Sequence, residues 1–498
     1  MRSVLCTALL GLLVQVSRAD NPPQVVLETN EALFTVLAAI NHCGYDIELN
    51  GSHPLRAQIR SEVKKTLEAA PDSAETIQAM CQVYNEHAQP DPSRTLAQYV
   101  SLALFLNPPP ELTVKVKEAD LPPDAAGLLG IVPLLQKFYS VAGLHAIWER
   151  HRDAYGALSD AYHEPLSKML FDTEIYLKVP SGSYLGRSFT VFFDPLGAPS
   201  QTNARNYGAD YYIVISPGAG SAVKTAQIRH TYLHYLVDPL ALKYPAETKR
   251  LEPLLNATRT APLDESFKSD ISLLAAECFI RAVEARTAGN SKTPEADRLR
   301  AVDDSLVQGY VLTRYFYDAL AGFEKDPAGL RTAYGEMLAH IEVGKESRMA
   351  GQIQFAARSD PELLHLSRPA ENKTLVMAEE RLATGDKDTA QKLAQQVLDE
   401  KTEDPGRALF ILAQVAAASS NMDGARNYFE RALEVAHEPK VVAWSHIYLG
   451  RIFDLREERD EAVVHYKAAL NTGAALPGVK DAAERGLQQP YEPPRPQQ

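Results

Sequence analysis

The stretch Ile-Arg-His-Thr-Tyr-Leu-His-Tyr-Leu-Val-Asp-Pro, residues 228–239, points most directly to both a fold and a site. His230 and His234 are four residues apart. Apolar side chains recur at the same interval, at Ile228, Tyr232 and Leu236. A period of about four residues predicts a helix, and residues i and i+4 lie on one helical face. We therefore expect both imidazoles to face the same way, where they can bind one metal ion.

Extended segments are predicted before this helix. The runs 174–179 and 188–193 are apolar or alternating and are separated by glycine-containing turn residues, so they predict a hairpin. A third strand is expected at 210–216, with Ser221 as the N-cap of the helix that follows. The helix is expected to end at Asp238, because the next residue is a proline and disfavours helical backbone before it.

Most of the remaining chain up to residue 360 has helical periodicity. Amphipathic runs broken by Pro- and Gly-containing turns predict helices over 31–41, 54–69, 74–87, 264–286, 294–323 and 327–347. The polar segment 359–373 contains two prolines and is the predicted domain boundary.

A repeat follows that boundary. Ala390, Ala425 and Ala462 recur at intervals of 35 and 37 residues. The residues four positions further on are Ala394, Phe429 and Tyr466. This register resembles the tetratricopeptide repeat, whose period is about 34 residues. The resemblance covers residues 371–473 and implies a solenoid of helical hairpins that binds a protein or peptide partner.

Residues 1–19 have the features of a secretory signal peptide. Arg2 gives a positive start, the apolar run 4–14 is too short to cross a membrane, and residues 17–19 place small side chains at a cleavage position. We therefore expect cleavage after Ala19 and a secreted or periplasmic protein. No later segment is apolar enough to predict a membrane span.

Net charge narrows the classes of binding partner, and cysteine content limits the disulfides that can form. The chain has 64 acidic and 51 basic side chains, a formal net charge of −13, which does not favour nucleic acid or anionic lipid. Cys43, Cys81 and Cys278 lie outside the predicted signal and are too few for a disulfide framework. A single bridge between Cys43 and Cys81 remains open in an oxidising compartment.

A third metal ligand must come from another element. Glu277 is the best candidate, because it lies in an apolar helical run where an unpaired carboxylate would be costly. Two alternatives stay open: Glu277 can instead form an i,i+4 ion pair with Arg281, and Asp238 can instead supply the third ligand.

A strand, a helix with two histidines and a Glu on a later helix resemble the gluzincin metallopeptidases. The resemblance implies that His230, His234 and Glu277 hold zinc. Asp270, two turns before Glu277, would be a carboxylate that orients a histidine. Active members have the HExxH motif, whose Glu takes a proton from zinc-bound water. This chain has Thr231 there, so the zinc ligands match the family but the base does not.

The predicted fold is mainly α. A helical and α+β metallopeptidase-like domain with a small β-sheet is expected over residues 20–360, a tetratricopeptide solenoid over 371–473, and a Pro-rich disordered tail over 474–498. The leading hypothesis is a secreted scaffold or binding protein whose peptidase-like domain has lost its base but can retain zinc. The alternatives are an active zinc peptidase that uses an unidentified base, and a structural part of an envelope assembly.

Overall fold

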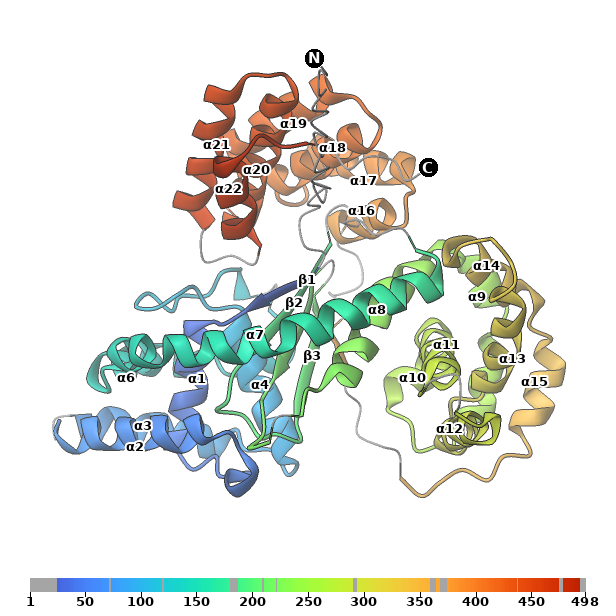
Figure 1. Cartoon of the computed structure of the whole chain (residues 1–498), viewed down its shortest axis with the longest axis horizontal. Coiled ribbons are helices and arrows are strands. Elements are labelled where there is room, and N and C mark those ends of the chain that lie inside the picture. Colours follow the sequence, from blue (N-terminus) through green and yellow to red (C-terminus); the bar gives the residue numbers. More distant parts are fainter. Residues whose placement is uncertain are drawn as a thin grey trace, which may run out of the picture.

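The computed structural model describes residues 25–70, 73–118, 121–179, 187–207, 210–220, 222–289, 293–358, 364–367, 374–436, 438–473 and 478–492. Within these ranges the chain is mainly helical and has one small β-sheet (Figure 1). The predicted signal peptide, the predicted cap Ser221 and the last six residues lie outside the described ranges. No described helix is both long enough and apolar enough to cross a membrane.

Five strands form the sheet in the order β1-β2-β4-β3-β5. Their bounds are β1 Val25–Glu28, β2 Ser188–Phe193, β3 Thr202–Tyr207, β4 Asp210–Ile215 and β5 Leu364–Ser367. β1, β2 and β4 run parallel to one another, β3 is antiparallel to β4, and β5 is parallel to β3. The predicted strands at 188–193 and 210–216 are thus confirmed, whereas β1, β3 and β5 were not predicted.

Both faces of the sheet are covered. Alternate residues such as Val191 and Ile213 belong to one hydrophobic core, which includes α8 and α11. The intervening Phe192 and Val214 belong to a second core, formed with the N-terminal helices. Because β-strand side chains alternate between faces, the sheet separates the two helical halves of the domain.

The N-terminal half consists of six helices before the long helix α7. These are α1 Glu31–His42, α2 Pro54–Glu68, α3 Ala74–Glu86, α4 Pro92–Leu104, α5 Pro123–Ala126 and α6 Val132–Val141. Cys43 at the end of α1 and Cys81 in α3 form a disulfide, the bridge that the sequence left open.

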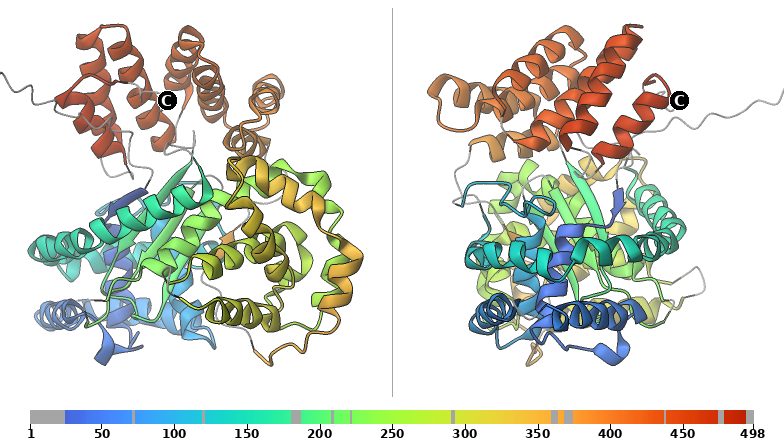
Figure 2. Two further views of the ribbon diagram at one scale, coloured as in Figure 1. Left: turned by 45° about the vertical axis from the view of Figure 1, so that its right-hand side comes forward. Right: turned by 90° about the vertical axis from the view of Figure 1, so that its left-hand side faces the viewer.

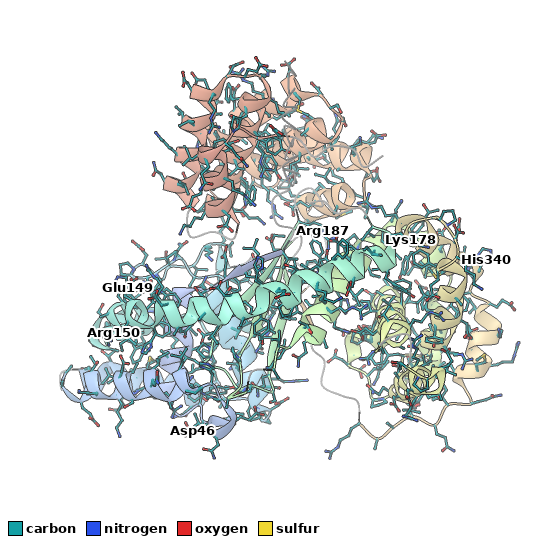
Figure 3. All side chains as sticks on the ribbon, in the orientation of Figure 1. Asp46, Glu149, Arg150, Lys178, Arg187 and His340 are labelled. Carbon is teal, nitrogen blue, oxygen red and sulfur yellow. A yellow bond between two sulfur atoms is a disulfide. The ribbon has the colours of Figure 1, made fainter. Side chains whose placement is uncertain are left out.

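The predicted strand at 174–179 is wrong, because residues up to Leu177 form the end of α7 (Leu144–Leu177). The apolar alternation there does not reflect one buried face. Leu177 is fully buried, but the exposed fraction of Ile175 is 58%. Lys178, labelled in Figure 3, ends the helix in the left-handed conformation. Its ammonium group contacts the backbone carbonyl of Phe323.

The predicted end of the histidine helix is also wrong. Helix α8 spans Thr225–Lys243 and contains Pro239 in its interior. Proline removes one backbone donor from a helix, and here the tight packing of the surrounding apolar residues outweighs that loss. Tyr235, Leu236 and Leu240 on either side are all almost fully buried. The helix therefore keeps Asp238 one turn beyond His234.

The second helical half packs around α11 (Ile271–Thr287). The other helices in this half are α9 Pro245–Lys249, α10 Glu265–Ser269, α12 Glu295–Gln308, α13 Thr313–Phe323, α14 Leu330–His340 and α15 Val343–Ala350. The chain then passes through β5 at the edge of the sheet, inside the segment predicted as a domain boundary.

Among the described residues, seven further α-helices form a separate helical unit, which we term the C-terminal module (residues 374–488). The last of them lies inside residues 474–498, where the sequence predicted a disordered tail. They are α16 Thr374–Ala383, α17 Lys387–Glu400, α18 Pro405–Ala418, α19 Met422–Val435, α20 Pro439–Leu455, α21 Arg459–Gly473 and α22 Val479–Gln488. Consecutive helices pack as hairpins. The recurring alanines Ala390, Ala425 and Ala462 are fully buried in the second helix of each pair.

The C-terminal module lies over one end of the sheet (Figures 1 and 2). Lys440 at the start of α20 forms an ion pair with Asp210 at the start of β4. The backbone N–H of Gly478 donates to Glu28 Oε1 in β1 at 3.0 Å. Polar contacts from two strands thus join the module to the first domain.

Candidate metal centre

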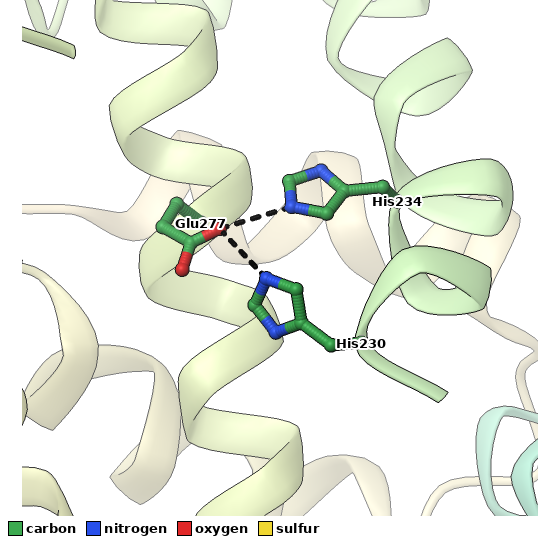
Figure 4. Close-up of side chains that lie close together, drawn as sticks. All are labelled: His230, His234 and Glu277. Atoms are coloured by element: carbon green, nitrogen blue, oxygen red, sulfur yellow. Dashed lines mark hydrogen bonds and ion pairs between the residues drawn. The ribbon is translucent and has the colours of Figure 1, made fainter. Parts of the chain in front are cut away.

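His230, His234 and Glu277 meet between helices α8 and α11 (Figure 4). The two Nε2 atoms point to the same oxygen, Glu277 Oε2, at 3.6 Å from His230 and 3.0 Å from His234. One candidate ligand atom from each residue lies within 4.8 Å of the other two. The exposed side-chain fractions are 9%, 2% and 1%, respectively. The structure thus brings together the three residues selected from the sequence.

A carboxylate contacts the far nitrogen of each imidazole. His230 Nδ1 lies 3.1 Å from Glu284 Oε1, and His234 Nδ1 lies 3.0 Å from Asp238 Oδ1. The second oxygen of Asp238 accepts a hydrogen bond from the Tyr211 hydroxyl at 2.9 Å, which ties the site to β4. Metal-binding histidines commonly donate their other ring N–H to a carboxylate, which fixes the tautomer and the ring orientation. Both histidines have this arrangement.

Arg281 engages the other oxygen of Glu277. Its Nε donates to Glu277 Oε1 at 2.6 Å, and its guanidinium carbon lies 3.7 Å from the ring centre of Tyr310. The ion pair considered from the sequence therefore exists, and it leaves Glu277 Oε2 directed at the histidines. One carboxylate serves both contacts.

The electrostatics favour charged forms of all three residues. Burial alone would lower the pKa of His234, but the charges and hydrogen bonds of Asp238 and Glu277 outweigh it and raise the pKa to about 10. Burial opposes a raised pKa at His230 too, and Glu284 and Glu277 overcome it. Burial would raise the pKa of Glu277, but Arg281 and the histidines hold it well below its usual range.

Thr231 is fully buried and does not supply a base. Its hydroxyl donates to the Gln227 carbonyl one turn earlier at 3.1 Å. A threonine hydroxyl has no accessible pKa near neutrality, and this one already has an acceptor. The carboxylate of Glu284 lies on the Nδ1 side of His230, away from the nitrogen that faces Glu277.

The predicted role of Asp270 is wrong. Its carboxylate caps α11, accepting hydrogen bonds from the backbone of Ser272 at 2.8 Å and Leu273 at 3.3 Å. The carboxylates at the histidines are Asp238 and Glu284 instead. Asp238 is therefore a partner of His234 rather than a rival third ligand. A sequence signal existed for both, since Asp238 is four residues after His234 and Glu284 is seven after Glu277.

The donor set fits a divalent metal ion. Two imidazole nitrogens and one carboxylate oxygen form a ligand set that zinc takes in proteins. With neutral imidazoles, the form that binds a metal, the set has three carboxylates, Glu277, Asp238 and Glu284, against one cationic side chain, Arg281. A dication replacing protons on the imidazoles would balance these buried charges.

The chain was compared with protein-family models, with curated proteins and with solved structures, and no match was found in any of the three.

Proposed function

We propose that this protein is a secreted binding or scaffold protein with two parts. The first is a metallopeptidase-like domain that retains a zinc ion but has no general base. The second is a tetratricopeptide module that binds a protein or peptide. The observation that carries the proposal is the convergence of two carboxylate-oriented histidines on Glu277 Oε2.

Zinc at this site would join α8 to α11, and it is the only chemistry the proposal assigns to the metal. Three features argue against turnover. Thr231 replaces the base, its hydroxyl is already bonded to a carbonyl, and the ligating side chains are almost fully buried. A catalytic zinc site needs an open coordination position that substrate can reach.

The second part of the proposal rests on the C-terminal module. Its helices pair as hairpins, and the sequence repeat coincides with those pairs. Each second helix buries three residues in the same register, which are Ala390, Ala394 and Val397, then Ala425, Phe429 and Ala432, then Ala462, Tyr466 and Ala469. Such solenoids present extended surfaces for partner proteins and rarely carry chemistry.

Metal analysis of the purified mature protein tests the first part. We expect about one zinc per chain, lost in His230→Ala and retained in His163→Ala, whose side chain is exposed on α7. We also expect no hydrolysis of peptide substrates. Absence of metal from the wild type would make the histidines packing residues. Peptide hydrolysis that disappears on chelation and in His230→Ala would establish an active peptidase instead.

Two further experiments separate the remaining readings. Thr231→Glu restores the missing carboxylate, and chelator-sensitive hydrolysis by this variant would show that only the base had been lost. Capture experiments with the full-length chain, compared with a chain ending at residue 358, test the module. Partners retained only by the full-length chain support binding through residues 374–488, whereas equal retention contradicts it.

A further inference from the structure

A second pair of histidines lies in the last hairpin of the C-terminal module. His446 in α20 and His465 in α21 face each other, and their Nδ1 atoms are 2.9 Å apart. The ring centroids are 5.2 Å apart and the rings are tilted by 43°. Both side chains are half-buried, so solvent can reach them. Sequence spacing does not pair these residues, because they are nineteen positions apart on different helices.

We propose that His446 and His465 together bind a divalent transition metal ion, Cu(II) or Ni(II). Imidazole nitrogens lie about 2.0–2.1 Å from such an ion. Two nitrogens at that distance and at a right angle are about 2.9 Å apart, which is the separation of the Nδ1 atoms. Right-angled nitrogen and oxygen ligands are typical of square-planar Cu(II) and Ni(II) sites.

The surroundings hold one ring in place. Phe453 stacks on His465 with ring centroids 5.2 Å apart and an interplanar angle of 17°. The guanidinium carbon of Arg426 lies 4.6 Å from the centre of the Phe453 ring. Because Phe453 is almost fully buried, this stack restricts the orientation of His465 and prepares it for a ligand.

Calorimetric titration of the full-length, metal-stripped chain with CuCl₂ and NiCl₂ tests the proposal. The chain is first given one equivalent of zinc, so that the His230 site is filled where it binds zinc. We expect the wild type to bind one more Cu(II) or Ni(II) than His465→Gln and His446→Gln, each of which should weaken this site at least tenfold. His163→Gln is the matched control and should titrate as the wild type does.

Equal binding by the wild type and both glutamine variants would overturn the proposal and leave a hydrogen-bonded histidine pair. Electron paramagnetic resonance of the copper-loaded wild type and His465→Gln gives a second readout, because copper can displace zinc from the two imidazoles of the His230 site. An additional two-nitrogen copper signal in the wild type that is absent from His465→Gln is expected, and identical signals in the two proteins would contradict the site. Failure of zinc to bind at His230 would change only the first step, because the conclusion depends on the difference between wild type and variants.

Discussion

The side chains at the His230 site fit metal binding, but the residue at the position of the catalytic base does not fit catalysis. Every ligand has a second contact that fixes its orientation, whether a carboxylate at Nδ1 or the guanidinium of Arg281. The residue where an active peptidase needs a carboxylate is instead a buried threonine bonded to its own helix. Under the proposed function, the three side chains are therefore oriented to hold a metal ion, and the base of an active peptidase is missing.

Asp238 is expected to determine metal affinity without touching the metal. Asp238→Asn keeps the shape of the side chain but removes the charge that holds the His234 Nδ1 proton. Losses of 10- to 100-fold in metal affinity are typical of such changes. We expect a loss in that range, measured by competition with a chromogenic zinc chelator. Asp160→Asn, on the exposed surface of α7, should bind zinc as the wild type does. Equal affinity in Asp238→Asn would show that His234 is oriented by packing alone.

At the scale of elements, helices α8 and α11 build the site. The points of interest are the C-terminal part of α8 and the N-terminus of α11. Helix α8 continues through Pro239, and within it Asp238 contacts His234 one turn earlier. Helix α11 begins at a true N-cap, Asp270, whose carboxylate satisfies backbone donors that have no partner within the helix. The sequence predicted a helix at both places, but it ended the first at Asp238 and ran the second through Asp270 without a break, and it gave Asp270 a histidine-orienting role.

Asp270→Ala distinguishes a helix cap from a metal partner. Loss of an N-cap side chain costs about 0.5–2 kcal/mol, so the free energy of unfolding should fall by about 1 kcal/mol. Zinc affinity should stay at the wild-type value, because Asp270 contacts the backbone of α11. Denaturant unfolding and chelator competition measure the two quantities. Asp303→Ala, at an exposed position within α12, serves as the control. Unchanged stability together with weaker zinc binding would instead support the histidine-orienting role.

At the scale of the whole molecule, the C-terminal module is joined to the sheet through polar and charged groups. Asp210 and Lys440 form an ion pair, and Glu28 accepts from the Gly478 backbone. Burial raises the pKa of Glu28 to about 7, although the Gly478 hydrogen bond opposes the shift. Asp481 raises this pKa further and Lys115 lowers it. The junction therefore holds a proton that the unfolded chain would release.

Because Glu28 holds this proton only in the folded chain, the free energy of unfolding depends on pH. The folded-state pKa of Glu28 is about 7 and the ordinary value is 4.5, so its contribution is complete below about pH 4.5 and is lost as the pH rises toward 7. Glu28→Gln cannot ionise and should gain about 1–3 kcal/mol relative to the wild type between pH 4.5 and 7.5. Urea unfolding at several pH values measures this difference. Glu434→Gln, exposed on α19, is the control, and its free energy of unfolding should change with pH as that of the wild type does. If the free energy of unfolding of Glu28→Gln also changes with pH as the wild type's does, Glu28 is not the source of the pH dependence.

The sequence by itself determined the helical character, two of the five strands and the three residues that meet at the site. Those features depend on local periodicity and on spacing within one helix, which the chain displays directly. It predicted neither β1 nor β5, because four-residue strands have too little pattern of their own and form through pairing with distant segments. The rule that alternating apolar residues predict a strand also failed at residues 174–179. Ile175 fits the alternation, but it is exposed on a helix.

Only the tertiary structure decided how the chosen residues act. The contact of Asp238 with His234 lies within α8, but the contact of Glu284 with His230 depends on the packing of α8 against α11. The pairing of His446 with His465 likewise depends on how one hairpin closes. Sequence spacing shows which side chains share one helical face. Contacts between faces are set by burial across the whole core, so they appear only when the helices are placed together.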